Sequence, residues 1–200
     1  MTVNMFTNSR PGAERLIVKT SASFFDRFGE MPVKVYCDVH PDTEGAGEYV
    51  DMLRIMFGTV IVTDSLSDGS IKAVESCTDE HTFMLEHDWL FLDGITHSLD
   101  EICEQMRCSG LMHMRFNKRD NKPKSWDTSL RDVPGRVPFC LTDFLSNNPH
   151  IIDVGMYRKY ALPRLKRTRG KKGIEHELQG VEGAIYGPIG YPATIQHIGR

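Results

Sequence analysis

Short apolar runs and amphipathic segments alternate along the first 120 residues of the chain. The short runs, many of them rich in β-branched side chains, predict strands at residues 3–7, 33–38, 59–63, 82–85 and 111–116. The amphipathic segments have apolar residues at helical spacing and predict helices at residues 14–28, 49–57, 70–77 and 99–106. Strands that alternate with helices indicate an α/β fold with a central, mainly parallel sheet.

Two of the predicted helices have clear local signals. Apolar side chains between Tyr49 and Phe57 recur three and four residues apart, so they share one face of a helix. Ser98 and Glu101 have the spacing of a capping box, in which each side chain bonds the backbone N–H of the other residue. This pair predicts a helix that begins at Leu99.

The pattern is less regular in the rest of the chain. Residues 117–135 are polar and predict a long loop, the kind of segment in which binding residues collect. Residues 156–162 can form a helix, whereas residues 170–190 are rich in glycine and predict irregular structure. No repeat or linker divides the chain, so we expect a single domain over residues 1–200.

Polar side chains follow several of the predicted strands. The segment from Thr7 to Arg10 follows the first strand, Asp38 ends the second, and Glu86 and Asp88 follow the strand at residues 82–85. Ligands of parallel sheets bind beyond the carboxyl ends of the strands. We therefore expect a binding site at this edge.

The charge of the chain is uneven. There are 24 lysines and arginines against 27 aspartates and glutamates, for a net charge of -3, so the chain as a whole is no polycation. Six cationic side chains nevertheless lie close together, at Arg164, Lys166, Arg167, Arg169, Lys171 and Lys172. This cluster is typical of either a phosphate-binding patch or a solvated loop.

Composition favours a globular protein of the cytoplasm. Hydrophobic residues make up 40% of the chain, without a run of about 18 apolar residues, so no membrane insertion is expected. The segment Met1–Phe6 is too short and polar for a signal peptide. The five cysteines form no CxxC pair, which favours reduced thiols.

The segment Glu86-His87-Asp88 is the most informative one for chemistry. If strand geometry persists through it, Glu86 and Asp88 point to one face and His87 to the other. Two carboxylates at a sheet edge suit Mg²⁺ or Mn²⁺, which can hold a diphosphate leaving group. His197 could complete such a site with a neutral imidazole. The alternatives are an acidic loop and a histidine that is simply packed or exposed.

These two segments together resemble GT-A glycosyltransferases, with family-2-like members closest. Those enzymes carry a D/E-x-D motif after a central hydrophobic strand, which Leu85–Trp89 resembles, with Glu86 in place of the usual first aspartate. Several GT-A families also end their catalytic region with a segment similar to Gln196–Gly199, whose histidine binds the same metal. The resemblance implies a Rossmann-like GT-A fold in which residues 1–120 bind the nucleotide sugar and residues 121–200 form the acceptor side.

The resemblance also implies roles for single residues. Asp88 and His197 would bind a divalent metal, Mn²⁺ or Mg²⁺, and Glu86 would support the metal or contact the ribose. The donor would be a UDP-sugar, and its sugar would be transferred with inversion at the anomeric carbon. Its nucleotide and pyrophosphate would be contacted by Thr7, Ser9, Arg10, Asp38 and Lys72.

Inverting members of the family place an acidic pair in a G-x-E-D context as catalytic base. The nearest match here is Gly173–Leu178, with His176 where an aspartate is often found. The base stays open among Glu175, His176 and Glu177, with Glu175 favoured as the group that deprotonates the acceptor hydroxyl. The alternative is a charged start of a surface helix.

Acceptor contacts are expected from Trp89, which could stack on a sugar or pack in the core, and from His150, Arg167 and Arg169. Small phage-type glycosyltransferases modify hydroxymethylated pyrimidines in DNA, and this chain is similar in style. The resemblance implies a location in the host cytoplasm and DNA contacts at residues 164–172, with the target base out of the stack. A glycan or protein acceptor, a nucleotidyltransferase, and a non-catalytic nucleotide-binding module are the alternatives.

Overall fold

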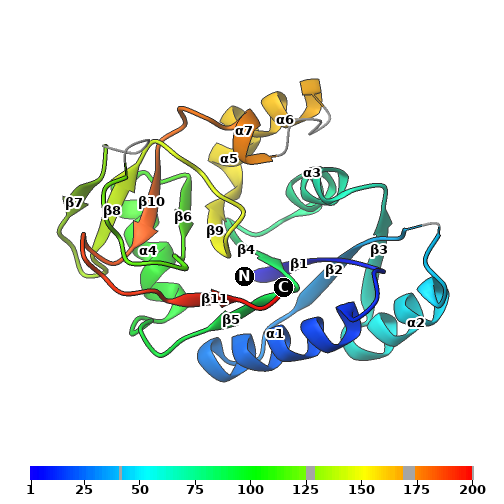
Figure 1. The fold of residues 1–200 in the computed structure, drawn as a ribbon. Helices are drawn as coiled ribbons and strands as arrows, with labels where there is room; N and C mark the ends of the chain where they lie inside the picture. Colours follow the sequence, from blue (N-terminus) through cyan, green and yellow to red (C-terminus); the bar gives the residue numbers. More distant parts are fainter. Residues whose placement is uncertain (41, 125–128, 169–173, 200) are drawn as a thin grey trace.

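A mixed sheet of nine strands forms the centre of the protein in a computed structural model that describes residues 1–40, 42–124, 129–168 and 174–199 (Figure 1). The strand order is β3-β2-β1-β4-β9-β6-β10-β8-β7. The strands of this sheet are β1 (Thr2–Asn8), β2 (Val33–Asp38), β3 (Thr59–Thr63), β4 (His81–Glu86), β6 (His113–Arg115), β7 (Arg131–Val133), β8 (Phe139–Thr142), β9 (His150–Asp153) and β10 (Gly183–Tyr186).

The first half of the sheet is parallel. Strands β3, β2, β1 and β4 run in one direction, and β6 pairs in parallel with β10. Strand β9 lies antiparallel between β4 and β6, and β8 and β7 continue the sheet in antiparallel pairs. The prediction of an α/β fold with a central, mainly parallel sheet is confirmed.

Helices cover both faces of the sheet (Figure 1). One core lies under α1, α2 and α4, and the other lies under α3, α5, α6 and α7. Neighbouring strand residues enter opposite cores, as Leu85 and Met84 do, because side chains alternate along a strand. The helices are α1 (Ala13–Phe28), α2 (Ala46–Phe57), α3 (Leu66–Ser76), α4 (Leu99–Ser109), α5 (Val154–Tyr160), α6 (Leu162–Thr168) and α7 (Ile174–Glu177).

The local signals account for where two helices begin. The predicted capping box is present at α4, since Ser98 Oγ accepts from the backbone N–H of Glu101 and the Glu101 carboxylate accepts from that of Ser98. Helix α3 begins earlier than predicted, at Leu66 rather than residue 70, because the Ser65 side chain accepts from the backbone N–H of Asp68. Gly69 lets this helix approach the sheet closely, since a Cβ there would lie 3.2 Å from Tyr36 Cβ.

The prediction of irregular structure for residues 170–190 is wrong for part of that range. Gly183–Tyr186 forms β10, a strand buried between β6 and β8. Residues 174–177 form the short helix α7, while residues 169–173 lie outside the described part of the chain.

A second, two-stranded sheet joins the middle of the chain to its last residues. Strand β5 (Trp89–Phe91) pairs antiparallel with β11 (Ile195–His197), with His197 opposite Trp89. This pairing brings the C-terminal segment next to the end of β4 (Figure 1). Within the ranges that the structure describes, no helix is both long and apolar enough to cross a membrane.

Candidate active site

The carboxyl ends of β1, β2 and β4 meet at one edge of the sheet. Asn8 is in register with Asp38, and Phe6 is in register with Glu86. A cavity of about 120 Å³ lies at this edge. It is lined by Phe6, Thr7, Asn8, Asp38, Leu66, Glu86, His87 and Asp88. The structure thus brings Thr7, Asp38, Glu86 and Asp88 together, as the order of the strands predicts.

Two of the residues expected at the nucleotide, Thr7 and Ser9, bond to other parts of the protein, and Arg10 lies outside the cavity. The Thr7 hydroxyl lies 2.6 Å from the Tyr49 hydroxyl, so it ties β1 to α2. Ser9 Oγ accepts from the backbone N–H of His40 at 2.8 Å and holds the loop after β2. Arg10 follows the end of β1 and is exposed, but it does not line the cavity.

Lys72 lies on α3 and lines none of the cavities described here. Its Nζ is 2.6 Å from Asp68 Oδ2, four residues earlier on the same helix. This is the geometry of an exposed helical ion pair, which contributes little to stability. The structure does not bring Lys72 to the other candidate residues.

The strand does not continue through Asp88. Strand β4 ends at Glu86, and residues 87–88 form a turn before β5. The strand geometry on which the expected alternation of Glu86, His87 and Asp88 depended therefore does not persist through this segment. Glu86 and Asp88 nevertheless line the same cavity, and the His87 side chain is largely buried.

Asp88 and His197 meet across the small sheet. Nε2 of His197 lies 3.0 Å from Oδ2 of Asp88, and the backbone N–H of Ile198 donates to the Asp88 carbonyl at 2.8 Å. Gly199 is packed directly against the Asp88 carboxylate, where a Cβ would overlap Oδ2. The C-terminal segment therefore fixes the position of Asp88.

This pair fits a divalent cation. Oδ1 of Asp88 is buried and has no hydrogen-bond partner among the residues described, so the carboxylate has unused capacity. Adjacent ligands of an octahedral ion, each at about 2.1 Å from it, are about 3 Å apart, as these two side-chain atoms are. The described ranges contain no ready-made cluster of three or more such ligands, so substrate oxygens and water would have to complete the shell.

The surroundings of Glu86 disfavour the charged form of its carboxyl group. Burial, together with the nearby negative charges of Asp88 and Glu175, raises the pKa of Glu86 from its ordinary value of 4.5 to about 8. Lys118 opposes this shift. A neutral carboxyl group beside the Asp88–His197 pair can donate a hydrogen bond to a phosphate or ribose oxygen.

We expect Glu86→Gln to stabilise the protein without metal and nucleotide as the pH rises. Above about pH 4.5 the unfolded carboxyl group is ionised, whereas the folded one keeps its proton until about pH 8. The folded state then binds more protons, so the free energy of unfolding falls through this window by on the order of a few kcal/mol. Because glutamine does not ionise, the Glu86→Gln variant should not show this fall in the free energy of unfolding.

Urea unfolding of wild type and Glu86→Gln at several pH values tests this expectation, with the exposed Glu48→Gln as control. The difference between wild type and Glu86→Gln should grow from about pH 5 to about pH 8 and then stay constant. A difference that does not change with pH would show that Glu86 ionises at its ordinary pKa.

A wider cleft of about 580 Å³ opens beside the Asp88–His197 pair. It is lined by Leu66, Glu86, Trp89, Lys118, Arg119, Asn147, Asn148, Glu175 and His197. Three residues predicted for different roles, Glu86, Glu175 and His197, therefore face one space. They come from β4, α7 and β11, which lie far apart in the chain.

Glu175 is held in place by the loop before β9. Its Oε1 accepts from Ser146 Oγ at 2.7 Å and from the backbone N–H of Asn147 at 2.9 Å. No partner of Oε2 is found among the residues that the structure describes, so this oxygen is available to a substrate. The two other candidate bases differ: His176 is exposed and lines a neighbouring pocket, and Glu177 lines neither space.

Two expected acceptor residues are buried. Trp89 lines the cleft, but it is 4% exposed and packs edge-on against the His197 ring at 4.8 Å between centroids. His150 lies in the centre of the sheet, where its ring stacks on His113 at 4.3 Å. Burial lowers the pKa of His150 to about 4. Neither side chain is free to follow a mobile substrate.

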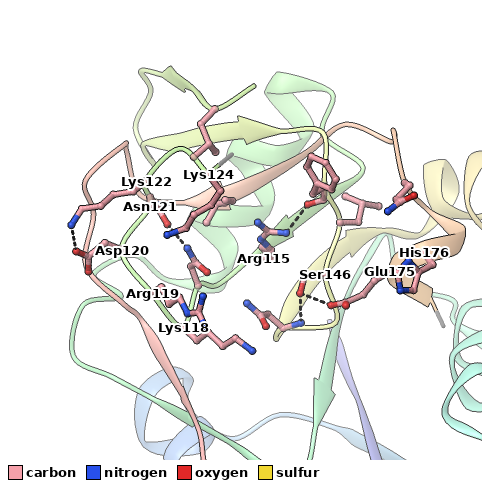
Figure 2. Close-up of a pocket in the computed structure, with 17 residues that line it drawn as sticks. Arg115, Lys118, Arg119, Asp120, Asn121, Lys122, Lys124, Ser146, Glu175 and His176 are labelled. Carbon is pink, nitrogen blue, oxygen red and sulfur yellow. Dashed lines mark hydrogen bonds and ion pairs between the residues drawn. The ribbon is translucent and has the colours of Figure 1, made fainter. Parts of the chain in front are cut away.

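The last two expected acceptor residues belong to the basic cluster. Arg167 is exposed at the end of α6 and lines none of these cavities, and Arg169 lies outside the described residues. The cationic side chains that do line the cleft are Lys118 and Arg119, which the sequence indicated only as part of a polar loop. Figure 2 shows this loop facing Glu175 across the adjoining pocket.

Solved structures with the same fold include crystal structures of S. aureus TarS, a glycosyltransferase. The match to TarS has a TM-score of 0.60 at 10% identity and covers 99% of this chain and 37% of that one. TarS 1-349 gives 0.54 at 10% identity, covering 99% and 60%. TarS 1-349 in complex with UDP-GlcNAc gives 0.53 at 12% identity, covering 100% and 59%.

No protein-family model and no curated protein matches the sequence. The chain spans 37% to 60% of the length of the TarS chains that it resembles. At such low identity the similarity extends to the fold alone. The chain has a GT-A-like glycosyltransferase fold.

Proposed function

We propose that this protein transfers a sugar from a nucleotide-diphosphate sugar, a UDP-sugar, to an acceptor hydroxyl. The observation that carries the proposal is the contact between Asp88 and His197 at the carboxyl edge of the sheet, beside a cleft that Glu175 also faces. The structures of TarS 1-349 with UDP and with UDP-GlcNAc support this choice of donor, since they share the fold.

The two parts of the chain would have different roles in binding and catalysis. Residues 1–120 supply the cavity lined by Asn8, Asp38 and Asp88, which would hold the nucleotide. Residues 121–200 supply Glu175 and the C-terminal segment with His197. The cleft between these parts would hold the reacting sugar.

Asp88 and His197 would hold a divalent metal, Mn²⁺ or Mg²⁺, which neutralises the diphosphate as it leaves. Glu86 would support the metal or contact a donor oxygen from the same cleft. Lys118 and Arg119 would add positive charge on the opposite wall of the cleft.

Glu175 would act as the base. Its free oxygen would take the proton of the acceptor hydroxyl while the hydroxyl oxygen attacks the anomeric carbon. The bond from that carbon to the diphosphate oxygen breaks, and UDP leaves with the bonding electrons. Direct attack in one step would invert the anomeric centre. His176 and Glu177 are the other residues considered for this role.

The acceptor that we propose is a hydroxymethylated pyrimidine in DNA, which would place the enzyme in the cytoplasm of a host cell. A glycan or protein acceptor is the alternative. The other classes are a nucleotidyltransferase, which would release pyrophosphate, and a nucleotide-binding module without turnover.

Product analysis tests the proposal. We expect the protein with Mn²⁺ and a UDP-sugar to release UDP, slowly with water as acceptor, and no pyrophosphate. UDP-glucose, UDP-galactose and UDP-GlcNAc are the donors to compare. Pyrophosphate release would indicate a nucleotidyltransferase, and UDP binding without turnover of any donor would indicate a binding module.

A further inference from the structure

Glu175 also lines a second pocket, of about 550 Å³ (Figure 2). It opens into the cleft beside His197, because Lys118, Arg119, Asn148 and Glu175 line both spaces. A group bound in this pocket could therefore present a hydroxyl to Glu175 while the donor fills the cleft. This is the position of an acceptor.

The pocket is cationic on a protein that is acidic overall. Its lining includes five cationic side chains, Arg115, Lys118, Arg119, Lys122 and Lys124, against two acidic ones, Asp120 and Glu175. The formal charge of this lining is thus +3, whereas the chain carries -3. A concave surface of one sign concentrates ligands of the opposite sign.

Much of this charge is not neutralised within the protein. Lys122 pairs with Asp120 at 2.7 Å, and Lys118 lies 5.4 Å above the Trp89 ring. Arg119 and Lys124 form no ion pair with any residue that the structure describes. Figure 2 shows these side chains along one wall, opposite Glu175.

The lining of this pocket also includes four apolar residues, which are Leu130, Phe144, Leu145 and Ile185. Of these, Phe144 is partly exposed. The exposed amide of Gln179, also in the lining, can both donate and accept hydrogen bonds. An aromatic surface next to cationic side chains suits a base and its phosphates, whereas a neutral glycan would leave the charges unused.

We propose that this pocket binds one nucleotide unit of a nucleic-acid strand, with the flanking phosphates on the wall formed by Arg119, Lys122 and Lys124. The proposal rests on the glycosyltransferase function and adds where its acceptor lies. The unit must be single-stranded or turned out of a duplex, because a stacked base cannot enter the pocket.

The basic cluster at residues 164–172 is a weaker site for the strand. Lys166 pairs with Glu75 on α3, and Arg164 also has an interaction partner. Neither these residues nor Arg167 lines a cavity that Glu175 faces. Lys171 and Lys172 lie outside the described residues. The two basic segments can be compared directly by mutation.

The test is binding of a fluorescent oligothymidylate of about 12 nucleotides, followed by anisotropy as the salt is raised from about 50 to about 200 mM. Lys122→Ala combined with Lys124→Ala is compared with a matched control, Lys166→Ala combined with Arg167→Ala. We expect the first variant to bind on the order of 10-fold more weakly, with a salt slope lower by about 1.4, and the control to bind like wild type.

Several results would overturn the proposal. They are unchanged binding in the Lys122/Lys124 variant, an equal loss in the control, and competition by a neutral maltooligosaccharide. Binding of inorganic polyphosphate as tight as that of the oligonucleotide would also overturn it, since polyphosphate has no base. UDP titration of the wild type and of each variant separates the proposed transferase function from the proposed nucleotide pocket. If the wild type binds no UDP, the result contradicts the transferase function and leaves the proposal for this pocket unaffected.

Discussion

Asp88→Ala and His197→Ala are each expected to weaken metal-dependent binding of UDP by at least about 100-fold. The two side chains meet at 3.0 Å, and the second oxygen of Asp88 is buried without a partner in the described chain. Because only two protein side chains would hold the metal, the removal of either side chain should release it. Calorimetric titration with UDP, with and without Mn²⁺, measures the effect.

Two neighbouring residues provide matched controls. Asp93→Ala removes an exposed carboxylate shortly after β5, and Gln196→Ala shortens the exposed residue before His197 in β11. Both should bind UDP with Mn²⁺ like wild type. Asp88→Asn adds a check on folding, because asparagine keeps the shape of the side chain and a hydrogen bond to His197 while removing the charge.

The outcomes separate the donor from the metal. Wild-type affinity for UDP in both Asp88→Ala and His197→Ala would contradict the metal assignment. A wild type that binds no UDP when Mn²⁺ is present would contradict the donor assignment. Equal UDP binding with and without Mn²⁺ would leave a transferase whose diphosphate is neutralised by protein cations, for which Lys118 and Arg119 are the candidates.

The half of the fold that is parallel could be predicted well from the sequence. Each of the strands β1 to β4 contains at least three apolar residues, so the local pattern and the tertiary position agree. Asp88 and His197 could be selected as candidate metal ligands, because each lies in a short motif that resembles a known family. Their contact depends on the pairing of β5 with β11, which no local pattern predicts.

Strand β10 could not be predicted because its stability comes from its neighbours. Gly183–Tyr186 has only four residues and begins with glycine, which disfavours an isolated strand. Pairing with β6 and β8 on both sides decides its conformation. By contrast, the early start of α3 had a signal that was missed, namely the Ser65-x-x-Asp68 capping sequence.

The cationic wall of the proposed acceptor pocket depends on contacts between residues that are distant in the sequence. Asn121 is 1% exposed, and its side-chain amide donates to the carbonyls of Tyr186 and Gly187. The backbone N–H of Asn117 donates to Thr194 Oγ1. The C-terminal segment therefore shapes the loop that carries Lys118 and Arg119, so its position could not be read from the loop itself.

Glu175→Gln is expected to lower the rate of UDP release from a UDP-sugar by about 10²- to 10⁴-fold while UDP binding stays within about 2-fold of wild type. Glutamine can still accept the hydrogen bonds from Ser146 and Asn147, so the loop before β9 should keep its place. Only the capacity to take a proton is lost. Release of UDP with water as acceptor can be followed before the natural acceptor is identified.

Glu177→Gln and His176→Ala decide whether the base has been assigned correctly. Both residues lie on α7 next to Glu175, but neither lines the cleft with Glu86 and His197, so each should lower the rate by less than about 10-fold. A larger loss in either of them than in Glu175→Gln would move the base to that residue. Comparable small losses in all three variants would mean that proton removal by α7 does not limit the reaction.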